Sequence, residues 1–141
     1  MNIEDAAEWI KMADNDFDSA KLLNESIRKH YEIICYHCAQ AVEKYLKGYL
    51  ICNNAVPEKT HDLLFLNKLC IKRDKIFENI IVECGFLNRF VNDIRYPHKY
   101  EVNEIDTNFS ISVVEKIIKF TPISDLINII NNENRNEETT L

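Results

Sequence analysis

The chain has 141 residues, of which 46% are hydrophobic and 28% are charged. This composition is typical of a folded globular protein and excludes a disordered chain, and the length is that of a single domain. The sequence has only 2 Gly and 3 Pro, which are too few for the many turns of an all-β sandwich or barrel. Its net charge of −6 argues against broad electrostatic binding to duplex nucleic acid or anionic membranes.

Two long amphipathic helices are predicted first. Apolar side chains recur every three or four positions from Ala6 to Ile27, and Asn2 is placed to cap the start of this helix. Trp9 and Phe17 belong to the same apolar stripe, so we expect both to be buried. The same spacing from Cys35 to Leu50 predicts a second helix.

Four further helices are predicted from periodicity and capping residues, over residues 60–72, 74–96, 106–120 and from 121 onward. Pro97 ends the second of these, because a residue that precedes proline is disfavoured in the α region. Thr121 followed by Pro122 is typical of a new helix start. The sequence therefore predicts an all-α fold, an up-down antiparallel bundle of four to five helices plus a short C-terminal helix.

One domain is expected over residues 1–131, followed by a flexible polar tail over residues 132–141 that lacks helical periodicity. No apolar run approaches the ~18 residues that suggest a membrane span. The five cysteines follow no signal peptide, so they are expected to be reduced core thiols of a cytoplasmic protein. Cys35 and Cys38 form a C-x-x-C pair without a second pair at zinc spacing, so we predict no metal and no cofactor.

The second predicted helix carries polar side chains opposite its apolar stripe. His37, Gln40 and Lys44 follow one another at steps of three and four residues and therefore share a face. The row could present hydrogen-bond donors to a phosphate or to a protein partner. The alternative is an ordinary solvated helix face.

Groups suited to phosphate chemistry are concentrated between residues 88 and 100. Arg89, Asn92, Arg95 and His98 lie where Pro97 is expected to break a helix. Arginine binds phosphate in a bidentate manner, and histidine transfers protons near neutral pH. These are the groups needed for metal-free RNA cleavage, in which the 2′-hydroxyl attacks its own phosphate. The alternative is that Arg95 is a cation at a helix C-terminus and His98 an ordinary loop residue.

Four blocks of the sequence resemble the HEPN family in order and spacing. They are Trp9-x3-Ala13-x2-Asp16-x3-Ala20, the run from Cys35 to Lys47, Thr60-His61-Asp62-Leu63, and Arg95-Tyr96-Pro97. The resemblance covers roughly residues 5–120. It implies a helical bundle that is commonly a dimer and that belongs to a prokaryotic toxin–antitoxin pair with a small nucleotidyltransferase. Many members of the wider superfamily are metal-independent ribonucleases.

The resemblance also implies roles for individual residues. Arg95 and His98 would be the catalytic pair, and His98-x-Tyr100 resembles the end of a motif in toxins whose Tyr is adenylylated by the partner. Phosphate-binding residues would be Arg89, Asn92, His37, Gln40 and Lys44. The two residues between Arg95 and His98 are fewer than in the ribonuclease members. Two functions stay open: a nucleotide- or RNA-binding protein that acts as a metal-independent endoribonuclease, and a non-catalytic dimeric interaction module.

Overall fold

The computed structural model describes residues 1–56, 58–91 and 101–139. These residues form six α-helices and one 3-10 helix: α1 (Ile3–Asn24), α2 (Tyr31–Cys52), α3 (Leu63–Arg73), η1 (Lys75–Ile80), α4 (Ile81–Asn88), α5 (Glu104–Lys119) and α6 (Thr121–Thr139). No strand occurs in the described part of the chain, so the predicted all-α fold is confirmed.

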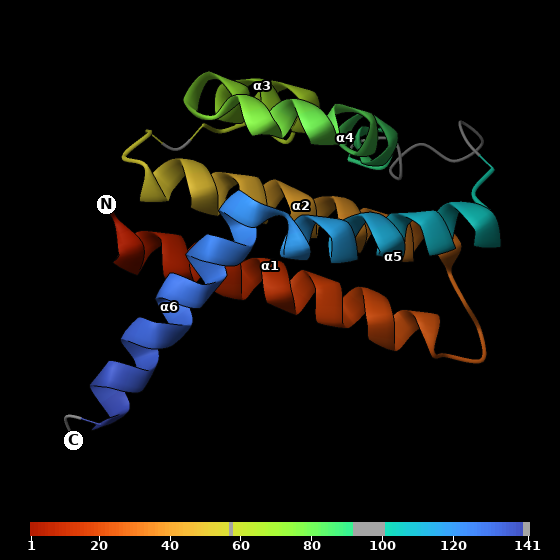
Figure 1. Ribbon diagram of the computed structural model, residues 1–141. Coiled ribbons are helices and arrows are strands. Elements are labelled where there is room, and N and C mark those ends of the chain that lie inside the picture. The colour runs from red at the N-terminus through yellow and green to blue at the C-terminus, as the bar shows by residue number, and fades with distance from the viewer. Residues whose placement is uncertain (57, 92–100, 140–141) are drawn as a thin grey trace.

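Helix α2 is the centre of the molecule. It packs along α1 as a long antiparallel hairpin and also contacts α3, α4, α5 and α6 (Figure 1). Helices α1 and α2 approach closely at Gly48, where an added Cβ would lie 2.9 Å from Ile10 Cδ1 and would require the end of that side chain to shift. Tyr45 and Leu46 of α2 and Phe77 of η1 are fully buried between these layers. Burial of such large side chains supplies the main favourable free energy of folding.

The structure confirms some of the predicted helix ends and capping residues and corrects others. Asn2 accepts a hydrogen bond from the Asp5 backbone N–H and caps α1 as predicted. The first helix ends at Asn24, however, so Ile27 is fully exposed and its predicted place on the apolar stripe was wrong. Helix α3 is capped by Asp62 instead of Thr60, because Asp62 can accept from two N–H groups of the first turn.

The helix predicted from Asp74 to Pro97 differs most from the structure. Asp74 caps a 3-10 helix, η1, and α4 continues from it only to Asn88. A 3-10 helix has about 3.0 residues per turn instead of 3.6, so the apolar face shifts along the chain. Ile81 is consequently 44% exposed, whereas Phe77 and Leu87 are buried.

Two other expectations were corrected by the packing. Phe17 is buried, but Trp9 is only half-buried, with Lys47 Nζ 5.4 Å from its ring centroid. Helix α6 continues to Thr139, beyond the predicted domain end, and its side chains are all exposed after Ile130. Figure 1 shows this part of α6 extending away from the bundle. No described helix is both long and apolar enough to cross a membrane.

Candidate functional site

Arg89 is the residue on which the candidate site is built. It follows the last residue of α4, and its backbone N–H donates to the carbonyls of Phe86 and Leu87. The guanidinium carbon lies 5.3 Å from the ring centroid of Phe86 and 5.2 Å from that of Phe90. Contacts of this kind restrict the orientation of the planar guanidinium, whose fork of N–H groups has the geometry that matches a phosphate. The half-buried guanidinium is therefore suited to a phosphate.

The other residues predicted around Arg89 follow it directly in the chain. Asn92, Arg95, His98 and Tyr100 all lie in the segment 92–100, outside the described residues. Their roles stay predictions. The segment joins the end of α4 to α5, and so begins only three positions after Arg89.

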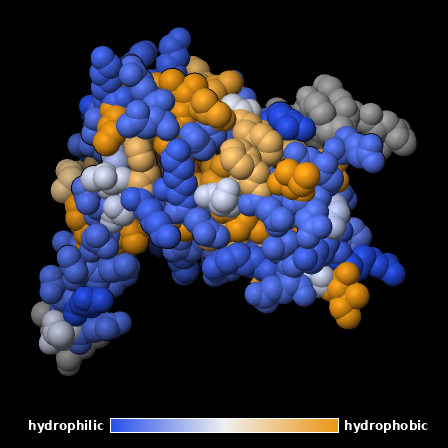
Figure 2. Space-filling model, turned by 45° about the vertical axis from the view of Figure 1, so that its right-hand side comes forward, coloured by the Kyte–Doolittle hydropathy of each residue, from blue (hydrophilic) through white to orange (hydrophobic). Residues whose placement is uncertain are grey.

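Exposed apolar side chains also occur on α3 and α4. Figure 2 shows apolar residues gathered over the upper part of the molecule, where Figure 1 places these helices. We call Leu64, Phe65, Ile81 and Val82 the α3–α4 apolar surface; they are 43%, 41%, 44% and 76% exposed. Phe90 is buried, and its ring lies 5.6 Å from that of Phe86.

The polar row on α2 is paired with a carboxylate that the sequence did not assign to the site. His37 Nδ1 lies 3.1 Å from Asp16 Oδ1, and Lys44 Nζ donates to the other oxygen of the same carboxylate. Gln40, between them in the row, is half-buried. Asp16 therefore neutralises part of the positive charge of the row and ties α1 to α2.

A second ionic cluster lies further along α2. The Glu43 carboxylate is only 3% exposed, and it accepts hydrogen bonds from Lys47 Nζ at 3.1 Å and from His61 Nδ1 at 2.8 Å. Buried charges are tolerated when they are paired in this way. The cluster fixes His61, in the loop before α3, against the central helix. His61 stands in the Thr-His-Asp-Leu motif, which is the only sequence signal that pointed to it.

All five cysteines are buried, and no cluster of metal ligands was found in the described residues. Burial raises the pKa of the Cys84 thiol to about 12 and also raises the pKa of Cys38 and Cys70. Cys35 lies 3.3 Å from the Ser110 hydroxyl, which donates to its sulfur. These thiols are therefore neutral at physiological pH and unsuited to nucleophilic chemistry.

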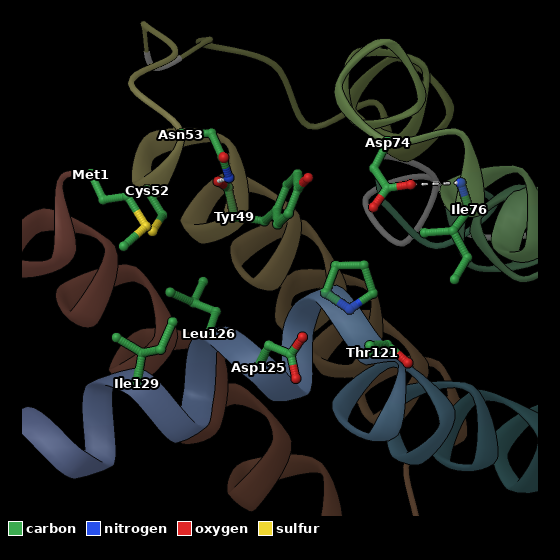
Figure 3. A pocket seen from close by; sticks show the side chains of 11 residues that line it. Met1, Tyr49, Cys52, Asn53, Asp74, Ile76, Thr121, Asp125, Leu126 and Ile129 are labelled. Atoms are coloured by element: carbon green, nitrogen blue, oxygen red, sulfur yellow. Dashed lines mark hydrogen bonds between the residues drawn. The ribbon is translucent and has the colours of Figure 1, made fainter.

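A pocket of about 260 Å3 opens where the end of α2 meets the starts of η1 and α6 (Figure 3). Asp125, Leu126 and Ile129 line it from α6, and Asp74 lines it from the start of η1. Asp74 is already used as the cap of η1, with its Oδ1 3.1 Å from the Ile76 backbone nitrogen. None of the predicted site residues lines this pocket.

Comparison with known proteins agrees with the helical architecture. The HEPN domain family model matches residues 6–125. The crystal structure of TT1696 from Thermus thermophilus superimposes with a TM-score of 0.72 at 20% sequence identity, over 89% of this chain and 99% of that chain. At this identity the likeness extends to the fold alone. No curated protein matched the sequence.

Proposed function

The chain belongs to the HEPN domain family, and from this we propose that it is a homodimeric protein that binds a nucleotide or RNA phosphate at the end of α4. Its partner in this proposal is a nucleotidyltransferase, in a prokaryotic toxin–antitoxin pair. The observation that supports the phosphate site best is the placement of Arg89. Its guanidinium lies against two phenylalanine rings, immediately before the segment that contains Arg95 and His98.

The chemistry proposed for this site is cleavage of RNA without a metal ion. Arg89 and Arg95 would bind the phosphate oxygens and stabilise the charge that develops on them. His98 would act as the acid or base while the 2′-hydroxyl attacks the adjacent phosphorus and the 5′-oxygen leaves. Because the nucleophile belongs to the RNA, the protein needs to supply only positioning, charge and proton transfer.

Binding of a fluorescently labelled single-stranded RNA, measured by anisotropy, tests the phosphate site. We expect Arg89→Ala and Arg95→Ala to weaken binding about tenfold or more, since each loses ~1.4 kcal/mol or more of phosphate contact. Arg73→Ala, at the exposed end of α3, is the matched control and should bind as the unmodified protein does. Absence of RNA binding by the unmodified protein would refute the proposal.

Cleavage of the same RNA tests the catalytic part. We expect His98→Ala to slow cleavage by about two to four orders of magnitude, the usual contribution of a general acid or base, and chelators to have no effect. Tyr100→Phe should leave cleavage intact but prevent transfer of AMP from ATP by the partner, because the phenolic oxygen is the acceptor. RNA that stays intact at every protein concentration would exclude the ribonuclease.

The alternative function is a non-catalytic dimeric interaction module. The α3–α4 apolar surface favours it, because exposed apolar side chains gather at protein–protein contacts. The pairing of His37 and Lys44 with Asp16 also favours it, since that carboxylate offsets their charge. The two functions are distinguished by RNA binding, which only the first requires.

A further inference from the structure

Asn88 is the last residue of α4. Both the oxygen and the nitrogen of its side-chain amide form hydrogen bonds with residues at the start of α3. Its Oδ1 accepts a hydrogen bond from the Leu63 backbone N–H at 2.9 Å, and its Nδ2 donates to Asp62 Oδ1 at 3.1 Å. Two bonds from one planar amide fix both the position and the rotation of that group. The residue that follows is Arg89.

Asp62 is itself held in place by several bonds. Its Oδ1 also accepts from the backbone N–H groups of Leu64 and Phe65, at 3.0 and 3.2 Å, as the cap of α3. The preceding residue, His61, is bonded to the buried Glu43 of α2. The loop is therefore bonded to the central helix through His61 and to the end of α4 through the next residue, Asp62.

We propose that Asn88 and Asp62 are positioning residues for Arg89, and that they fix the end of α4 so that the guanidinium meets a phosphate in one orientation. The inference rests on the proposed phosphate site. Ordinary capping of α3 requires only the Asp62 oxygen and its bonds to Leu64 and Phe65. The additional bonds of Asn88 serve to join the end of α4 to that cap, one residue before the proposed phosphate ligand.

The positioning can be measured without RNA, from the Nε–H signal of Arg89 in the NMR spectrum of 15N-labelled protein. Arg89→Ala assigns the signal. In the unmodified protein we expect a heteronuclear NOE close to that of the rigid backbone, and in Asn88→Ala a clear fall, because the end of α4 is no longer held. An Arg89 signal that is unchanged in Asn88→Ala would overturn the proposal.

A carboxylate at position 88 provides a second test. Asn88→Asp places two carboxylates against each other and should lower the Arg89 NOE. Asp74→Ala is the stability control: it removes a comparable cap from η1 and should leave the Arg89 signal unchanged.

The effect on RNA is tested with a double-variant cycle. Asn88→Ala should weaken RNA binding about fivefold, but should have no further effect in Arg89→Ala protein if it acts through Arg89. An equal loss in both backgrounds would show that Asn88 acts independently and would overturn the proposal. If the unmodified protein binds no RNA, the proposed function fails, and the NMR experiment alone still decides whether Asn88 positions Arg89.

Discussion

Glu43 and its lysine partner are both held almost fully out of water, whereas Glu83 on α4 is buried but paired with a half-exposed lysine. Lys47 bonds to Glu43 with a side chain that is 7% exposed, and Lys116 bonds to Glu83 with one that is 53% exposed, both at 3.1 Å. The two pairs have the same chemistry and distance but different solvation. Solvent screens the second pair, so its contribution to stability should be much smaller.

Replacing each lysine by methionine measures how much each ion pair contributes to the free energy of unfolding. Lys47→Met keeps most of the side-chain volume but leaves the Glu43 charge buried with His61 as its remaining partner, and should lower the free energy of unfolding by about 3–5 kcal/mol. Lys116→Met should lower it by less, because that lysine is 53% exposed and water reaches its end of the pair. Urea unfolding monitored by circular dichroism measures both values. Equal losses would show that Glu43 is better solvated than its contacts indicate.

The reactivity of the cysteine thiols can also be measured residue by residue. Because the thiolate is the reactive form, burial and raised pKa together should protect all five from alkylation. We expect the folded protein to take up no iodoacetamide at pH 8 during the time in which a free thiol reacts completely, and all five sites to react in urea. Mass spectrometry counts the adducts. Rapid labelling of Cys35 or Cys38 in the folded protein would contradict the packing around them.

Asn67 of helix α3 is a buried polar residue with an unsatisfied hydrogen-bond acceptor. The residue is 1% exposed, and its Oδ1 has no hydrogen-bond partner among the described residues. A buried acceptor without a partner costs about 1–3 kcal/mol. Asn67→Leu, which keeps the branching and the number of side-chain heavy atoms, should therefore raise the free energy of unfolding, by about 1 kcal/mol. Asn88→Leu is the control and should lower it, since that amide makes two bonds. A loss in Asn67→Leu would mean that a bound water satisfies the oxygen.

At the scale of helices, the sequence predicted what depends on local periodicity. The apolar stripes of α1, α2 and α5 are regular α-helical patterns, and these helices lie where they were expected. The 3-10 helix η1 was missed because its period differs from that of the surrounding pattern.

The candidate site was predicted less completely. Arg89 is identified by its position beside the Arg-Tyr-Pro segment, but its contact with Phe86 depends on how α4 ends. The pairing of Asp16 with Lys44 joins residues 28 positions apart, and no local pattern reports such a contact. The bond between Asp62 and Asn88, 26 positions apart, was missed for the same reason. Long-range polar contacts require the tertiary structure.

At the scale of the whole molecule, net charge limits how a phosphate can bind. The chain carries a charge of −6, so general attraction for nucleic acid is weak and affinity must come from a few well-placed groups. A two-fold dimer would bring two copies of Arg89 into one assembly. Homodimers bury their apolar surfaces against each other, and the α3–α4 apolar surface belongs partly to α4, the helix that Arg89 follows.

Two valines with similar exposure test whether the α3–α4 apolar surface forms the dimer. Val82, on α4, is 76% exposed, and Val56, in the loop after α2, is 82% exposed. A charge at the centre of an interface must be desolvated on association, so Val82→Asp should convert the dimer to a monomer of 16.6 kDa by light scattering at micromolar concentration. Val56→Asp adds the same charge outside that surface and should leave the dimer intact. A monomeric unmodified protein, or a Val82→Asp dimer as stable as the original, would refute this interface, because a carboxylate cannot be buried there without cost.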